Sequence, residues 1–180
     1  FVHGPVQKIG NSDFTFPVGK GGSLRPCGLT GITGLATGAF TAEYFPISAY
    51  TWGSAMEPTL DRVSDCEYWI IDRTAGIGNA VVVLSWDTPE SCGVTEPNDL
   101  RVARWDGSLW LDRGNGGASP LAAFGTVPSA GAQTLFSPWT LASINGLNPL
   151  PISLVDFTAK PEGDRVRLDW ITASEQDNAL

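Results

Sequence analysis

Glycine and proline interrupt this chain so often that long amphipathic helices have no room. The 180 residues include 21 Gly and 13 Pro, and almost every window of a dozen residues holds one of them. The apolar residues between these breaks are mainly β-branched or aromatic, which favours strands over helices. The sequence therefore predicts an all-β fold of short antiparallel strands.

Nine runs bounded by turn residues have the composition of strands. They are residues 6–10, 13–19, 23–30, 38–46, 66–73, 79–87, 100–105, 108–113 and 134–143. The run 79–87 is apolar on both faces, so we expect it at the centre of a sheet. Many short antiparallel strands predict two packed sheets, an antiparallel β-sandwich of jelly-roll or immunoglobulin-like type.

The clearest hairpin is predicted at residues 100–113, where Asp106-Gly107 has the composition of a two-residue turn. Such a turn fixes which residues of the two strands lie opposite each other. The predicted pairs are Trp105 with Ser108, Ala103 with Trp110, and Arg101 with Asp112. One sheet face would then carry a cross-strand ion pair beside aromatic side chains.

The C-terminal region follows a different pattern from the rest of the chain. We expect a sandwich domain over residues 1–146, a proline-containing linker at 147–151 and two further strands within 152–180, joined by a Pro-Glu-Gly-Asp turn. Apolar residues alternate in the second of these strands, and the parity changes along the first, which predicts either a β-bulge or a strand buried on both faces. The residues concerned are Ile152, Leu154, Phe157, Val166, Leu168 and Trp170.

A lone pair of strands is marginally stable in water, so the apolar row of this C-terminal pair needs a cover. Three covers remain open: the remainder of a module in a longer chain, the chain's own sandwich, or a second copy. Donation of the strands to the sheet edge of the next copy would generate a head-to-tail filament.

The charge balance excludes two classes of partner. Eleven Lys and Arg against nineteen Asp and Glu leave a net charge of −8. Such a field repels nucleic-acid phosphates and anionic lipid. No apolar run is long enough to span a bilayer. We therefore expect neither nucleic-acid binding nor membrane insertion.

The residues offer little for catalysis. The only histidine, His3, lies near a chain end, where a catalytic triad would be poorly held. Acidic residues that could form a catalytic pair are predicted instead to be solvated; they are Glu43, Glu57, Asp61, Asp65 and Glu67. We expect a non-enzymatic protein without a cofactor. Calcium held by loop carboxylates stays open, with no ligands assigned, because no stretch has EF-hand spacing.

Cysteines and tryptophans supply the remaining candidates. Cys66 and Cys92 could meet across neighbouring strands as a disulfide, whereas Cys27 is expected to be a small buried residue. Two tryptophans in strongly apolar strands, Trp69 and Trp86, are predicted to lie in the core. Tryptophans near turns or on a mixed face could form a platform for glycans, though packing roles are favoured for these too; they are Trp52, Trp105 and Trp110.

Several phrases of this chain resemble a β-rich domain of secreted and cell-surface proteins of the Bacteroidota. They include "FTAEYF", "CEYWIIDR", "LSWDTPESCGVT" and "DLRVARWDGSLW". The stretch "NPLPISLVDFTAKPEGDRVRLDWITASEQDN" resembles the fibronectin-type-III-like segment that commonly follows, ahead of a type IX secretion sorting domain. This chain departs from that pattern in carrying only part of the segment.

The resemblance implies an extracellular or cell-surface location and a structural or adhesin-like role, with no defined reaction. It also implies that Cys66 pairs with Cys92 and that Cys27 takes a position usually held by an aliphatic residue. The first functional hypothesis is thus a filament subunit that binds further copies of itself through its C-terminal strands. The alternative is a carbohydrate-binding module of a larger secreted protein.

Overall fold

The computed structural model of this chain describes residues 1–87, 91–148, 154–163 and 165–172. Within these ranges the regular structure is strands, apart from two short 3-10 turns, η1 (Ala49–Thr51) and η2 (Pro97–Asp99). The chain divides into two compact units, Phe1–Leu150 and Pro151–Leu180. The all-β prediction is confirmed, and the division falls inside the predicted linker.

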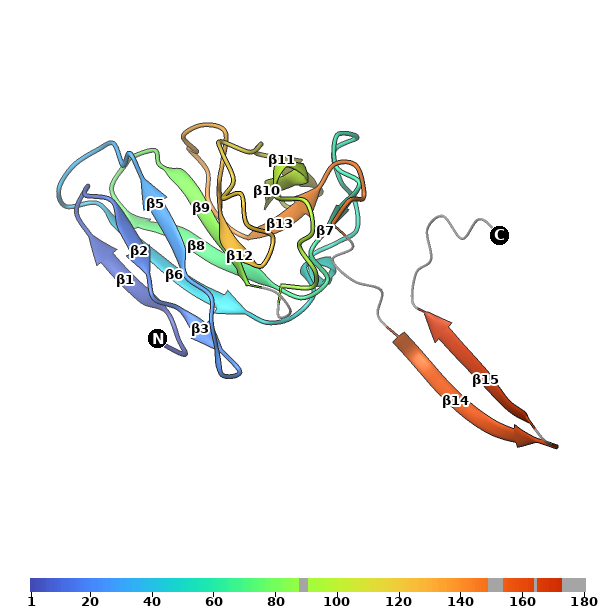
Figure 1. Cartoon of the computed structure of the whole chain (residues 1–180). Helices are drawn as coiled ribbons and strands as arrows, with labels where there is room; N and C mark the ends of the chain where they lie inside the picture. The colour runs from blue at the N-terminus through green and yellow to red at the C-terminus, as the bar shows by residue number, and fades with distance from the viewer. Residues whose placement is uncertain (88–90, 149–153, 164, 173–180) are drawn as a thin grey trace. The chain divides into compact units, whose positions relative to one another are not determined.

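The first unit is a β-sandwich of two packed antiparallel sheets (Figure 1). The larger sheet has the order β1 (Val6–Ile9), β6 (Ala39–Phe45), β8 (Tyr68–Ala75), β13 (Trp139–Ser143), β10 (Leu100–Trp105) and β11 (Trp110–Asp112), with β7 (Arg62–Val63) also paired to β13. The smaller sheet has the order β12 (Phe124–Pro128), β9 (Val81–Asp87), β5 (Cys27–Thr30) and β2 (Phe14–Phe16). A small hairpin joins β3 (Gly19–Lys20) to β4 (Ser23–Leu24).

The main core lies between the two sheets and takes side chains from both. Trp69 and Ile71 of the larger sheet and Leu29 and Leu84 of the smaller one are fully buried in it. Each such side chain contributes about 1.5–3 kcal/mol on burial. Trp86 is also buried, so both predicted core tryptophans are confirmed. Strand β9, predicted to be central, has β12 on one side and β5 on the other.

A second, smaller core covers the outer face of the larger sheet. It forms where the chain between β6 and β8 lies across that face, and it includes Ala49, Leu60, Tyr68 and Trp110. Successive side chains of a strand point to opposite faces. Strand β10 therefore sends Leu100 and Val102 to the main core and Ala103 to the second core.

The strand boundaries differ from the prediction where a predicted strand is interrupted. The predicted strand 13–19 is split into β2 and β3, and 23–30 is split into β4 and β5. Strand β12 was missed because its sequence is short and contains Gly125. A side chain there is excluded, since an added Cβ would lie 2.6 Å from the Trp86 ring.

The predicted register of the 100–113 hairpin is wrong by two residues. Trp105 pairs with Trp110 and Ala103 with Asp112, so the loop is four residues long. Asp106 explains this, because its carboxylate accepts hydrogen bonds from the backbone N–H groups of Ser108 and Leu109 at 2.8 and 2.9 Å. Arg101 lies opposite Ala142 of β13 instead of forming the predicted pair with Asp112.

The first unit continues beyond the predicted boundary at 146, since the division from the second unit follows Leu150. Asn148 is fully buried, and its side chain accepts from the backbone N–H groups of Thr95 and Glu96, both at 2.9 Å. It also donates to the Glu96 carbonyl at 3.0 Å. Asn148 thus ties the end of this unit to the η2 turn.

The second unit contains a two-stranded hairpin, β14 (Leu154–Glu162) and β15 (Arg165–Thr172). The register shifts between Leu154 and Asp156, as expected for a bulge, the first of the two predicted alternatives. Pairing continues to Glu162 opposite Arg165, so the connection is shorter than the predicted four-residue turn, and Gly163 adopts a φ of 65° there.

The predicted assembly residues can be placed by their register. Phe157 lies opposite Trp170, Ala159 opposite Leu168, and Leu154 opposite Thr172. Val166 is 65% exposed. Ile152 lies outside the described residues.

Candidate functional site

The three tryptophans predicted as a glycan platform lie together on the outer face of the larger sheet. Trp105 ends β10 and Trp110 begins β11, and their ring centroids are 5.5 Å apart. The loop after η1 brings Trp52 and Gly53 onto this pair. The Trp110 indole donates to the Gly53 carbonyl at 3.0 Å, and the Trp105 ring fills the space that a Cβ on Gly53 would need.

The three rings differ in how far solvent reaches them. Trp52 is 41% exposed, Trp105 is partly buried, and Trp110 is fully buried. A buried ring cannot stack on a sugar, so the platform role predicted for Trp110 does not fit its position. Trp110 instead anchors the loop that carries Trp52, through packing in the second core and its bond to Gly53.

Trp52 is one end of a row of aromatic side chains, which we call the aromatic row and define as Trp52, Tyr68 and Phe45. Trp52 packs edge-on to Tyr68 with ring centroids 5.9 Å apart, and Tyr68 stacks on Phe45 at 4.9 Å. The Lys20 ammonium lies 3.7 Å from the centre of the Phe45 ring and 2.6 Å from the Glu43 carboxylate. The aromatic row therefore has a charged group of each sign at its far end.

This arrangement suits binding better than bond breaking. Aromatic faces with adjacent hydrogen-bonding groups offer both stacking and polar contacts to a ligand. Burial raises the pKa of the Tyr68 hydroxyl, and a hydrogen bond from the Trp52 side chain opposes that shift. The phenol thus stays neutral at ordinary pH, and because Tyr68 is only 7% exposed, Trp52 is the ring of this row most open to a ligand.

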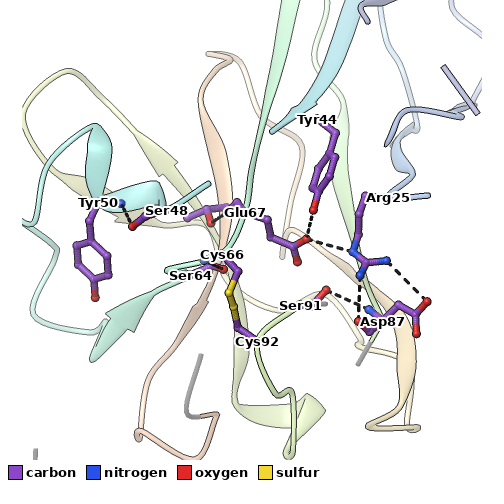
Figure 2. The surroundings of a disulfide bond; sticks show 11 residues. Arg25, Tyr44, Ser48, Tyr50, Ser64, Cys66, Glu67, Asp87, Ser91 and Cys92 are labelled. Carbon is purple, nitrogen blue, oxygen red and sulfur yellow. Dashed lines mark hydrogen bonds and ion pairs between the residues drawn. A yellow bond between two sulfur atoms is a disulfide. The ribbon is translucent and has the colours of Figure 1, made fainter. Parts of the chain in front are cut away.

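A buried ion pair lies beside the disulfide, as Figure 2 shows. The Arg25 and Glu67 side chains are 2% and 0% exposed, and the Arg25 Nε lies 3.1 Å from the Glu67 Oε2. The Tyr44 hydroxyl donates to the same oxygen at 2.9 Å. Arg25 also donates to the Asp87 carbonyl at 3.0 Å. The pair therefore links the larger sheet to the end of β9 in the smaller one.

The prediction that Glu67 is solvated is wrong. Glu67 has the same parity as Trp69 and Ile71, which face the main core, so its side chain points between the sheets. Burial raises the pKa of the Glu67 carboxyl to about 7, and the Ser91 hydroxyl, Arg25 and Tyr44 oppose this shift. A carboxyl with no exposed surface cannot reach a substrate, so we assign this pair to stability.

The predicted disulfide between Cys66 and Cys92 is present, with the two Cα atoms 6.0 Å apart (Figure 2). The geometric reason given for it was wrong. Cys66 precedes β8 and Cys92 follows β9, and these strands lie in different sheets. The bond therefore joins the two layers of the sandwich. Cys27 is free and buried, as predicted, and burial raises the pKa of its thiol.

The other acidic candidates have separate structural contacts. Glu57 accepts a hydrogen bond from the Asp112 backbone at 2.7 Å, and Asp61 pairs with Arg62 at 2.7 Å. Asp65 is half-buried. In the part of the chain that the structure describes, no three His, Cys, Asp or Glu side chains form a group that could hold a metal ion. No helix within the described residues has the length and apolar character needed to cross a membrane.

His3 lies at the exposed edge of the sandwich, where its ring stacks on Phe1 with centroids 5.1 Å apart.

Comparisons with known proteins give no match for this chain. No family model matches the chain, and no curated protein or solved structure matches it.

Proposed function

We propose that this protein is a non-enzymatic, extracellular, adhesin-like subunit that joins further copies of itself by strand pairing. The observation that supports it is an asymmetry of the sheet edges. Strand β11 is covered on its outer side by residues 55–57, where the Trp110 backbone exchanges hydrogen bonds of 2.9 Å with Ala55 and Glu57. Strand β12 is covered by residues 116–119, through Ser119 and Thr126.

Strand β1, at the opposite end of the larger sheet, has no such cover among the described residues and pairs with β6 only. The edge that continues β2 is covered by Val2, whose backbone exchanges hydrogen bonds with Pro17 and Gly19 at 2.8 and 3.0 Å. Unpaired edges expose backbone donors and acceptors and are templates for another strand. We assign the β1 edge as the acceptor.

The hairpin of the second unit is the matching donor. Within the described ranges, β14 and β15 pair with each other and leave their outer edges open. Strand β14 contains Pro161, which has no N–H to donate, whereas β15 contains no proline. We therefore assign β15 as the strand added to the next copy. A donor on one unit and an acceptor on the other give a head-to-tail chain.

The disulfide is the observation that supports the proposed extracellular location. Disulfides form and persist in oxidising compartments outside the cytosol. A bond that joins both sheets is best explained by folding in such a compartment.

Removing residues 151–180 is expected to abolish self-association. The full chain should form concentration-dependent oligomers in size-exclusion chromatography and linear assemblies in negative-stain microscopy, and the shortened chain should stay monomeric. Ile9→Lys, at a 69% exposed position of β1, should weaken assembly because a charge on an edge strand opposes pairing. Leu121→Lys, at a 55% exposed position near β12, is the matched control. A full chain that remains monomeric at every concentration would refute this proposal.

A second function, carbohydrate binding, is favoured by the exposed Trp52 at the end of the aromatic row. If it binds glycans, Trp52→Ala should lower affinity about tenfold, which corresponds to about 1.4 kcal/mol. Leu121→Ala should leave affinity unchanged. Binding on a glycan array, followed by titration of the best ligand, measures this effect. An affinity that Trp52→Ala does not alter would rule out the aromatic row as the contact surface.

A further inference from the structure

A groove at the β10–β11 end of the larger sheet carries two arginine side chains, Arg104 and Arg113. Its volume is about 470 Å³, which is within the range of small-molecule sites. Its lining residues are Arg104, Asp106, Leu111, Arg113, Gln133, Thr134 and Leu135. The groove lies apart from the aromatic row, on the other face of the strands.

The two arginines point toward the space between the sheets because of strand parity. Arg104 follows Leu100 and Val102 at alternate positions of β10, and both of those residues lie in the main core. Leu111 is the cross-strand partner of Arg104. Arg113 is held just beyond β11 by backbone bonds to Val102 at 2.8 Å and Ala130 at 2.8 Å. The fold thus brings two cations together in one groove at the end of the sandwich.

The protein provides hydrogen-bond acceptors for only some of the N–H groups of these two guanidinium groups. Arg104 is 8% exposed and donates to the neighbouring Trp105 carbonyl at 3.1 Å. The Arg113 Nε is buried and has no hydrogen-bond partner within the described residues. A buried donor without an acceptor is costly, so negative charge placed next to this guanidinium would be stabilising.

The two cations also repel each other. Burial lowers the pKa of Arg104, and the charge of Arg113 lowers it further. Asp106 is the nearby carboxylate that opposes this effect, but one of its oxygens already accepts hydrogen bonds from Ser108 and Leu109. In a chain with a net charge of −8, a groove with two partly buried cations and a single engaged carboxylate is an unusual local excess of positive charge.

We propose that this groove binds an oxyanion, the carboxylate or sulfate group of a small ligand, between Arg104 and Arg113. Guanidinium groups bind planar and tetrahedral oxyanions through paired N–H donors. An oxyanion would accept hydrogen bonds from the arginine N–H groups that line the groove and reduce the repulsion between the two cations. The side chains of Gln133 and Thr134 would provide further polar contacts at the rim. The site does not depend on strand addition or on the aromatic row.

Titration with glucuronate, inorganic sulfate and a neutral methyl glucoside tests the proposal. Binding is followed by isothermal calorimetry and by the NMR signal of the Arg113 Nε–H. At least one of the two anions should bind and shift that signal, and the neutral sugar should not. Glucuronate alone would identify a carboxylate ligand, and sulfate alone a sulfated one. No binding by either anion, or equal binding of the neutral sugar, would overturn the proposal.

Two substitutions identify the groove as the binding site. Arg113→Gln should lower anion affinity at least tenfold, and Arg101→Gln, on the opposite face of β10, should not. Leu135→Glu gives a second test that leaves the core intact, because Leu135 is 61% exposed. Its carboxylate should occupy the groove and abolish anion binding, whereas Leu121→Glu should have no effect. Unchanged affinity in Leu135→Glu would exclude this groove even if Arg113→Gln fails to fold.

Discussion

Raising the pH from about 4.5 to about 7 is expected to destabilise this protein by about 3 kcal/mol through a single carboxyl group, Glu67. The carboxyl has its ordinary pKa of 4.5 in the unfolded chain and a pKa of about 7 in the folded one. Between these values the folded state holds a proton that the unfolded state has lost. The contribution is therefore complete below pH 4.5 and lost by about pH 7.

Glu67→Gln isolates this effect from that of other titrating groups. The variant keeps a neutral side chain of the same size, so its free energy of unfolding should lack the Glu67 component of the pH dependence. The difference between wild type and variant should shift in favour of the variant by about 3 kcal/mol from pH 4 to pH 8. Chemical denaturation at several pH values measures it. Glu43→Gln, at a partly exposed ion pair, is the control and should follow wild type more closely.

A constant difference between wild type and Glu67→Gln across this range would contradict the prediction. It would mean that Arg25, with its Nε 3.1 Å from the carboxylate, keeps Glu67 ionised in the folded protein. In that case the variant should be less stable at every pH, because the buried arginine loses its counter-ion.

Loss of the disulfide should have an effect of similar size. Replacing both Cys66 and Cys92 by serine is expected to lower the free energy of unfolding by about 3 kcal/mol, since the bond closes a loop with a sequence separation of 26 residues. Thermal or denaturant unfolding measures this change. The variant should be insensitive to reductant, whereas wild type should lose the same stability when reduced. Equal stability of oxidised and reduced wild type would contradict this prediction.

The disulfide and the buried ion pair should not act independently. Cys66 is the neighbour of Glu67 in the chain, and Cys92 is the neighbour of Ser91, whose hydroxyl opposes the raised pKa of Glu67. Groups in contact generally show non-additive effects. Removing the bond should let water approach Glu67 and so reduce the pH dependence described above. The triple variant with Glu67→Gln should therefore lose less stability than the sum of the separate changes.

The fold class could be predicted because it depends on local properties of the chain. Frequent glycine and proline exclude long helices, and the apolar run of β9 favours an inner position in a sheet, where Val82, Leu84 and Trp86 are buried and Val81 and Val83 are partly buried. The change in the alternation of apolar residues before Phe157 pointed to the bulge of β14, because this alternation is also a local property of the chain. Strand β12 was missed because Gly125 is required by a contact with Trp86, which is distant in sequence.

The binding residues were only partly predictable. Tryptophans near turns were correctly singled out, and Trp52, Trp105 and Trp110 lie together, but their exposure depends on the loop that covers them. Glu67 is two residues from Trp69 and so faces the same side of the strand, which could have predicted its burial. No local feature of the sequence pointed to Arg25 as its partner. The two groove arginines were missed because the apolar neighbours of Arg104 predict burial without indicating a ligand.

By itself, the sequence determined that this chain forms a β-sandwich with Trp69 and Trp86 inside it, because periodicity and composition act over a few residues. The tertiary structure alone decided that Arg25 meets Glu67, that the disulfide joins two sheets, and that Arg104 and Arg113 share a groove. These pairings join strands far apart in the sequence. Their energies arise from burial and charge, which exist only once the sheets have packed.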